Sequence, residues 1–121
     1  QKEKYLRPLC DGTAMSCFAM TEPEVAGSDP TLIKTTAVKD GDEWVINGHK
    51  WFISNARRAK FAILIARTED NPDLPQAANT AFLVDLPSEG WNRVREVETM
   101  HGGTGHSEIV IEDLRTRRPD P

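Results

Sequence analysis

Groups that could bind an anion are concentrated in residues 18–29, which read Phe-Ala-Met-Thr-Glu-Pro-Glu-Val-Ala-Gly-Ser-Asp. Thr21 supplies a hydroxyl where an apolar stretch runs into a proline, a pattern typical of a strand that ends in a loop. Gly27 and Ser28 can bend tightly and turn their backbone N–H groups outward, and such a concavity suits a phosphate. Gly-Ser-Asp is also a common turn sequence. Residue types alone therefore predict either a phosphate-binding loop or an ordinary turn.

Aromatic and hydroxyl side chains recur in residues 47–55, which read Asn-Gly-His-Lys-Trp-Phe-Ile-Ser-Asn. Phe52 and Ser54 are two positions apart, so a strand would put both side chains on one face. Trp51 would then point the other way, into the core or a contact with another domain. A ring and a hydroxyl on one face could line a ligand, and plain core packing is the alternative for Phe52.

Metal chemistry is not favoured by the remaining candidate ligands. His49, His101 and His106 have poor spacing for zinc, and the cysteines Cys10 and Cys17 do not join them in a ligand pattern. We assign no catalytic role to His101 or His106. Cys17 lies in an apolar context and is best interpreted as a small core residue. No disulfide framework is expected, which favours a reducing compartment.

Bulk properties indicate a single soluble module that does not bind nucleic acid. The chain has 121 residues, enough for one domain with a real core. Its net charge is −4 and its pI is about 5.3, whereas a nucleic-acid surface would be basic. No apolar run approaches the length of a membrane span, and no signal-peptide pattern is present. The first residue, Gln1, and the Arg-Arg-Pro-Asp-Pro ending suggest a piece of a longer protein.

Short strands separated by turn signals must position these groups. Residues 1–13 are predicted to form the end of a helix and a turn. Asp40-Gly41-Asp42 predicts a turn, and Asn47-Gly48 predicts a type I′ hairpin because both central positions favour positive φ. The segment 68–79, with two prolines, is expected to be a loop. The predicted strands are 16–20, 32–39, 43–46, 49–55, 61–67, 81–85, 92–97 (an edge strand) and 107–112.

This spacing of short strands predicts an all-β fold. We expect an antiparallel β-barrel, or two packed orthogonal sheets, of about seven or eight strands with a short helical or loop lead-in at the N-terminus.

Thr21-Glu22-Pro23, followed closely by Gly27-Ser28-Asp29, resembles a signature of the acyl-CoA dehydrogenase family of flavoproteins. Residues 44–55 resemble the second signature of its middle domain. Residues 1–9 are similar to the segment that leaves the family's first helical domain, and residues 109–115 to the strand that leads into its last. The Thr-Glu-Pro loop is one residue longer here than the usual form, as in a divergent branch of the family.

The resemblance implies a domain division and a set of ligands. Residues 1–13 would be the tail of a preceding helical domain, 14–115 the middle β domain, and 116–121 a tail toward the last helical domain. The implied cofactor is FAD and the implied substrate an acyl-CoA. Implied partners are electron-transfer flavoprotein as electron acceptor, helical domains of the same chain, and further copies in a homo-oligomer. The implied compartment is the cytoplasm in a bacterium, or the mitochondrion or peroxisome in a eukaryote, with no secretion.

The resemblance also assigns roles to individual residues. Ser28 would contact both the FAD pyrophosphate and acyl-CoA. Because alternate residues of a strand face the core, Phe18, Ala19 and Met20 could not all touch the ring. The implied cofactor-binding residues are Phe18, Met20, Thr21, Gly27, Ser28, Phe52 and Ser54.

No catalytic residue is expected in this chain, because the family takes its base from the last helical domain. Glu22, beside Pro23, is predicted to be structural rather than catalytic. Two other functions stay open: an acyl-CoA oxidase or flavin monooxygenase of the same superfamily, and a non-catalytic β-barrel assembly module that has lost flavin. The intact motifs around Thr21 and Ser54 argue against flavin loss.

Overall fold

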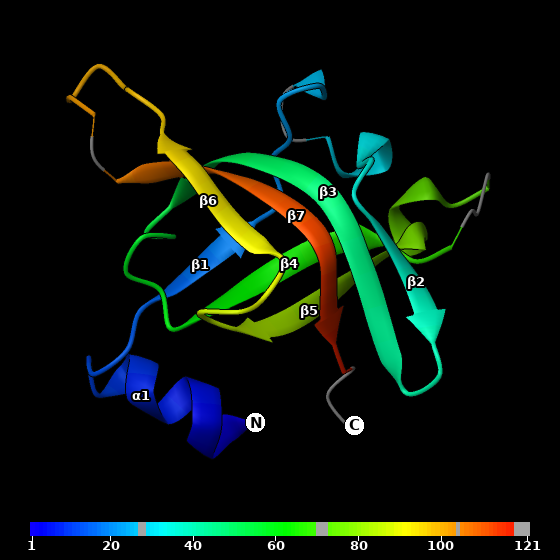
Figure 1. The fold of residues 1–121 in the computed structure, drawn as a ribbon, viewed down its shortest axis with the longest axis horizontal. Helices are drawn as coiled ribbons and strands as arrows, with labels where there is room; N and C mark the ends of the chain where they lie inside the picture. The colour runs from blue at the N-terminus through cyan, green and yellow to red at the C-terminus, as the bar shows by residue number, and fades with distance from the viewer. Residues whose placement is uncertain (27–28, 70–72, 104, 118–121) are drawn as a thin grey trace.

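Strands of one curled sheet enclose the hydrophobic core in a half-barrel (Figure 1). The computed structural model describes residues 1–26, 29–69, 73–103 and 105–117. Its strands are β1 (Ser16–Ala19), β2 (Thr36–Asp40), β3 (Glu43–Ser54), β4 (Phe61–Arg67), β5 (Asn79–Asp85), β6 (Trp91–Glu96) and β7 (His106–Thr116). The 7-stranded sheet has the order β1-β4-β2-β3-β7-β6, and β5 pairs with β4 off this path. The predicted all-β class is confirmed.

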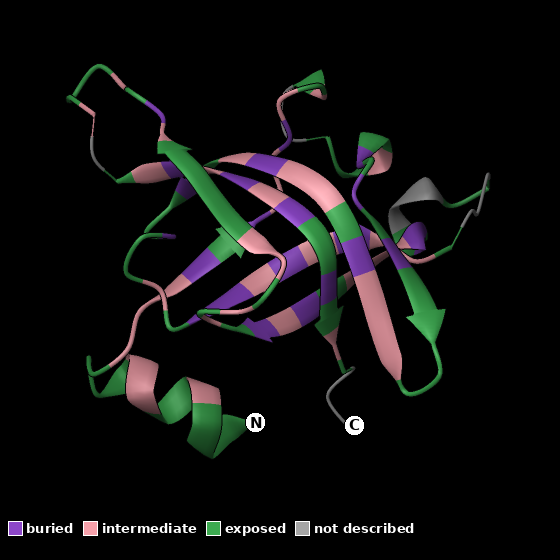
Figure 2. Cartoon of the chain, in the orientation of Figure 1, coloured by how far each residue is buried: buried purple, intermediate pink, exposed green. Residues whose placement is uncertain are grey.

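The sheet is mixed rather than wholly antiparallel. β1 pairs with β4 in parallel, and β2 meets the end of β4 in parallel at one residue pair. The parallel arrangement is possible because β2 and β3 provide a long crossover between β1 and β4. The other pairings are antiparallel. β6 is the edge strand at one end of the order, and its mostly exposed residues fit the edge position expected for residues 92–97 (Figure 2).

The predicted hairpin at Asn47-Gly48 is wrong, because both residues lie inside the 12-residue strand β3. The turn that joins β2 to β3 contains Gly41, which has φ of 61°. Gly48 serves a different purpose: a Cβ there would lie 2.2 Å from Oγ1 of Thr35. The glycine therefore permits a close approach between β3 and the segment before β2. A register shift against β7 occurs at the same place, between Ile46 and Gly48.

Several other element boundaries differ from the sequence prediction. β2 begins later than expected, because Pro30–Leu32 form a 3-10 helix. The Asp29 carboxylate caps this helix by accepting a hydrogen bond of 2.9 Å from the Thr31 N–H. In the predicted 68–79 loop, Pro75–Ala78 form a second 3-10 helix. β7 continues beyond the predicted 107–112 because it follows β3 to Trp44.

The core consists of buried aliphatic and aromatic residues of the curled sheet. In Figure 2 buried residues form purple bands that alternate along the strands with more exposed ones. Cys17 is buried there as predicted, and burial raises the pKa of its thiol to about 11. The fully buried apolar side chains are Ile46, Ile53, Leu64, Phe82, Ile109, Leu114 and others of the same kind.

The N-terminal lead-in is helical, as expected, and lies beside the end of the sheet where β4 begins and β5 ends (Figure 1). It consists of a π-helical turn at Lys2–Leu6 and the short helix α1 at Arg7–Cys10. The Tyr5 ring packs on the Phe61 ring with centroids 4.8 Å apart. Within the described ranges, no helix is both long and apolar enough to cross a membrane.

Candidate functional site

The end of β1 meets the middle of β3 at Thr21, and this junction brings the two motifs together. The Thr21 hydroxyl donates to the carbonyl oxygen of Trp51 at 2.5 Å, and the Trp51 N–H donates to the carbonyl of Thr21 at 3.0 Å. The hydroxyl proton is therefore used within the protein, and the hydroxyl oxygen keeps lone pairs for a ligand donor. Thr21, just after β1, and Trp51 of β3 are 30 positions apart in sequence and are thus joined by reciprocal bonds.

A buried ion pair fixes this junction from inside. The Lys50 side chain is 0% exposed, and its Nζ donates to the Met20 carbonyl at 2.9 Å and to Oε1 of Glu22 at 2.9 Å. Breaking such a pair would leave an uncompensated charge in the interior. The residue before Thr21 and the residue after it are therefore both held by one lysine of β3.

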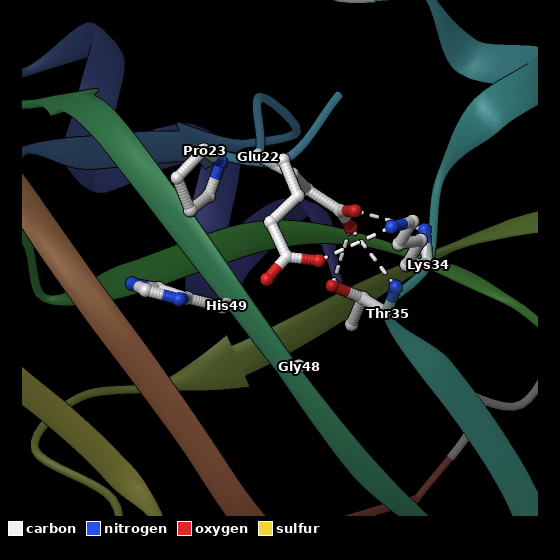
Figure 3. Close-up of a pocket in the computed structure, with 7 residues that line it drawn as sticks. Glu22, Pro23, Lys34, Thr35, Gly48 and His49 are labelled. Carbon is white, nitrogen blue, oxygen red and sulfur yellow. Dashed lines mark hydrogen bonds and ion pairs between the residues drawn. The ribbon is translucent and has the colours of Figure 1, made fainter.

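Glu22 also joins the junction to the start of β2 (Figure 3). Its Oε1 accepts from the Thr35 N–H at 2.9 Å and from the Thr35 hydroxyl at 2.5 Å, and its Oε2 accepts from the Lys34 N–H at 2.8 Å. Thr35 occupies the space that Gly48 leaves open on β3. These contacts make Glu22 the centre of a polar cluster drawn from three segments of the chain.

The surroundings shift both ionisable groups of the pair. Burial disfavours the Glu22 carboxylate, but hydrogen bonds from Thr35, Lys50 and the backbone outweigh it and lower its pKa. Burial also lowers the pKa of Lys50, and Glu22 offsets part of that change. A hollow of about 170 Å³ lies above the cluster, lined by Glu22, Pro23, Glu24, Lys34, Thr35, Gly48 and His49 (Figure 3). Because Oε1 of Glu22 already accepts three hydrogen bonds and Oε2 accepts one, the cluster is organised as a structural support.

The outer side of the junction carries exposed aromatic rings. Phe18 of β1 is 53% exposed and Phe52 of β3 is 42% exposed. Phe52 adopts φ of 53°, at a register shift between Lys50 and Ile53 that indicates a β-bulge. The bulge leaves Lys50 and Ile53 buried and turns Phe52 outward. Phe18 and Phe52 are therefore candidates for a contact surface.

Trp51 lies beside Phe52 rather than in the core of the sheet. Its ring is half-buried and meets the Phe52 ring edge-on, with centroids 4.9 Å apart. The prediction of a core position for Trp51 is therefore wrong, because the bulge breaks the simple alternation of a strand. A contact with another domain stays a prediction.

Ser54 lies further along β3, at its exposed end. Its hydroxyl oxygen is 2.9 Å from Nδ1 of His106 at the start of β7. Phe52 and Ser54 are both exposed, with buried Ile53 between them, and a face shared by the two side chains stays a prediction. Met20 is partly buried beside Lys50, and Gly27 and Ser28 lie outside the described residues.

Sequence reasoning missed Lys50 as a member of the site's support. A lysine amid the apolar residues of a strand was the available signal, since such a residue is almost never fully buried without a partner. Glu22 is the carboxylate that pairs with it, and its contacts are structural ones, as predicted for Glu22.

The exposed face has features that a flavin requires. An isoalloxazine ring needs an apolar wall and hydrogen-bonding groups along its polar edge and near N5. Phe18 and Phe52 supply exposed ring surface, and Thr21 and Ser54 supply hydroxyl groups around the same strand junction. The residues present therefore fit the outline of a flavin-binding wall.

Comparison with known proteins agrees with this interpretation. The family described as the acyl-CoA dehydrogenase middle domain matches residues 17–114. Acyl-CoA dehydrogenase family member 11 of Homo sapiens is 37% identical over 123 residues, covering 95% of this chain and 16% of that protein. The structure of an acyl-CoA dehydrogenase from Geobacillus kaustophilus is 33% identical with a TM-score of 0.84, covering 96% of this chain and 30% of that one.

A flavin is named in a further similar structure. It is a glutaryl-CoA dehydrogenase from Mycobacterium smegmatis in complex with FADH2, and is 31% identical with a TM-score of 0.81, covering 96% of this chain and 28% of that one. A half-barrel of this kind is a β domain of a flavoenzyme family. The chain belongs to the acyl-CoA dehydrogenase family, and it spans 16% to 29% of the length of the first curated relatives it matches.

Proposed function

We propose that this chain is the FAD- and acyl-CoA-binding middle domain of a longer flavin-dependent acyl-CoA dehydrogenase, with the division at residues 13 and 115 expected from the sequence. The observation that carries the proposal is the junction of β1 and β3, where Thr21 is bonded to Trp51 beside exposed Phe52. A buried ion pair supports that junction, so the outer face has a defined shape before any ligand arrives.

Each residue of the outer face has a proposed role. Phe52 and Phe18 form the apolar wall, with Met20 at its inner border. Thr21 accepts from a ring N–H through its free lone pairs, because its own proton is directed to Trp51. Ser54 supplies the hydroxyl near N5. Gly27 and Ser28 complete the set as the pyrophosphate loop, and Ser28 also contacts the acyl-CoA.

The proposed reaction is the α,β-dehydrogenation of an acyl-CoA thioester. Bound FAD would accept a hydride from the β-carbon at N5, and the residues described here would orient the ring and exclude water from its face. The base for the α-proton comes from another domain of the full-length protein, so this chain alone is inactive. Electron-transfer flavoprotein is the proposed acceptor, and helical domains and further copies of the protein cover the remaining surfaces.

The visible spectrum of the full-length protein tests this function. We expect a yellow preparation with flavin absorption that an acyl-CoA bleaches under anaerobic conditions. A flavin that bleaches but is reoxidised rapidly by oxygen, with hydrogen peroxide formed, would instead identify an acyl-CoA oxidase. Oxygen inserted into a substrate would identify a monooxygenase. A folded, colourless protein that does not respond to added FAD would refute the proposal and favour an assembly module.

A further inference from the structure

We infer that His106 is a positioning residue that sets the direction of the hydrogen bond made by the Ser54 hydroxyl. The observation is the distance of 2.9 Å between Nδ1 of His106 and Oγ of Ser54, across the last residue pair of β3 and β7. This inference rests on the proposed function, in which Ser54 faces flavin N5. No catalytic role is assigned to His106 from the sequence.

The backbone around His106 is held on both sides, so the ring has a defined place. The carbonyl of His106 accepts from the Val97 N–H at 2.7 Å, and the neighbouring Gly105 carbonyl accepts from the Asn55 N–H at 3.0 Å. Glu96 of β6 accepts from the Gly105 N–H at 3.3 Å and from the Ser107 hydroxyl at 3.0 Å. A single carboxylate thus contacts the residues immediately before and after His106.

The hydrogen bond between Ser54 and His106 can run in either direction, because each group can act as donor or acceptor. A serine hydroxyl has one proton to donate and lone pairs to accept, and each nitrogen of a neutral imidazole is a donor or an acceptor according to the tautomer. When Nδ1 carries its proton, His106 donates to Ser54 and the serine proton is free for a ligand. When Nδ1 is bare, Ser54 donates to His106 and presents only lone pairs outward.

Flavin N5 requires one of these arrangements when the ring is oxidised and the other when it is reduced. In the oxidised ring N5 is an acceptor, so Ser54 donates to it and accepts from His106. In the reduced ring N5–H is a donor, so Ser54 accepts from it and donates to bare Nδ1 of His106. Because His106 is partly exposed, solvent can move its proton between the ring nitrogens. His106 therefore satisfies Ser54 in both redox states, which a donor-only or acceptor-only neighbour would not do.

The test compares His106→Phe with His106→Asn in the full-length protein. Phenylalanine keeps a ring but removes both polar nitrogens. Asparagine offers an amide near the Nδ1 position that can also donate or accept. In His106→Phe the Ser54 hydroxyl loses the imidazole as its partner. In the oxidised complex its proton still goes to N5, whereas in the reduced complex that proton has no acceptor. Unsatisfied donors are tolerated less well than unsatisfied acceptors. The His106→Phe change should therefore weaken binding of reduced FAD more than binding of oxidised FAD.

We expect the ratio of the dissociation constants for reduced and oxidised FAD to rise at least about tenfold in His106→Phe, a fall of about 30 mV in the two-electron potential. In His106→Asn the ratio should stay within about threefold of the wild type. Fluorescence titration of the apoprotein and dye-linked potentiometry measure these quantities, and thermal unfolding shows that both variants fold.

The outcomes separate this inference from the proposed function. Equal two-electron flavin potentials in wild type and His106→Phe would overturn the inference about His106. The proposed function would still stand in that case, because the flavin is bound. Equal shifts in both variants would also overturn it, since a structural disturbance would then suffice. A wild-type protein without flavin would overturn both. Rescue by asparagine alone would support the positioning role.

Discussion

The two sides of β3 near its bulge differ in what they leave available. On the inner side, Lys50 is fully buried and bonded to Glu22 and the Met20 carbonyl. On the outer side, Phe52 and Ser54 are exposed, and Phe52 has a backbone conformation unusual for a bulky residue. The inner cluster contributes stability and shape, whereas the outer face keeps surface and hydrogen-bonding capacity for a ligand. Substitutions on the two sides should therefore separate folding from flavin binding.

The largest effect is expected from Lys50→Met, on the inner side. Methionine fits the space of the lysine stem but leaves the Glu22 carboxylate buried without its cation. The free energy of unfolding of the full-length apoprotein should fall by about 3–5 kcal/mol, as is usual when one partner of a buried pair is removed. Urea denaturation measures this change. As a control, Lys39→Met alters an exposed lysine and should change stability by less than about 0.5 kcal/mol.

A loss confined to flavin binding, with the unfolding free energy of Lys50→Met unchanged, would contradict the structural role assigned to the inner side.

Gly48→Ala should be the next most harmful change. The new Cβ would lie 2.2 Å from Oγ1 and 2.6 Å from Cβ of Thr35, and rigid atoms of two adjacent segments would have to separate. Overpacking of this kind costs about 1–3 kcal/mol, and it would also disturb the bonds from Thr35 to Glu22. The matched control is Gly103→Ala, where the nearest atom is 3.3 Å away on the flexible Glu98 side chain. Similar melting temperatures for the two variants would argue against the close approach.

The contrast between Gly48 and β4 explains how far the sequence predicts this fold. The predicted strand 61–67 has the same bounds as β4, because a continuous apolar run is a local signal for a buried strand. Asn47-Gly48 carries an equally local hairpin signal, but the reason for the glycine is Thr35, which reaches it only after the chain has folded. The contact between Gly48 and the distant Thr35 explains why a glycine stands within β3, and local patterns in a single sequence do not reveal such contacts.

The same limit applies to the candidate site. The spacing of Phe52 and Ser54 predicts only that they share a face, and it does not predict the bulge that accompanies the contact of Trp51 with Phe52. Nor do strand patterns pair Lys50 with Glu22, because 28 positions separate them. Recognising a lysine in an apolar strand would have raised the question of its partner without identifying that partner.

Thr21→Val tests the boundary between the two sides. Valine keeps the shape of threonine but removes the hydroxyl that bonds to Trp51 and is proposed to face the flavin ring. FAD binding to the full-length protein should weaken by about 1–3 kcal/mol, the usual cost of an unmet buried partner. Thr21→Ser retains the hydroxyl and should bind FAD more tightly than Thr21→Val. Unaltered flavin occupancy and redox behaviour in the valine variant would remove Thr21 from the ring contact.

Acid should weaken the inner side of β3. Glu22 has a lowered pKa in the fold, whereas an unfolded glutamate titrates near about 4.3. Its stabilisation is therefore complete above the unfolded pKa and is lost as the pH falls from there through the folded pKa. One such group changes stability by at most about 1.4 kcal/mol for each pH unit. Unfolding of the apoprotein in urea between neutral and acidic pH measures the slope.

Glu22→Gln should be less stable than the wild type at neutral pH and should have a shallower loss of stability in acid. Parallel acid curves for the two proteins would show that Glu22 does not titrate in the way its hydrogen bonds indicate.

The smallest effect on folding, and the sharpest contrast between the two sides, is expected from Phe52→Gly. Glycine adopts a positive φ without strain, so relief of the conformation at 53° should offset the loss of a half-exposed ring. The unfolding free energy of the apoprotein should change by less than about 1 kcal/mol, whereas FAD affinity should fall about tenfold because part of the apolar wall is lost.

Asn55→Gly is the matched control, because Asn55 also has a positive φ of 63° but no proposed flavin contact. Both variants should fold equally well and only Phe52→Gly should lose FAD. If Phe52→Gly were as damaging to folding as Lys50→Met, the outer ring would belong to the core, and the division of β3 into a supporting side and a binding side would be wrong.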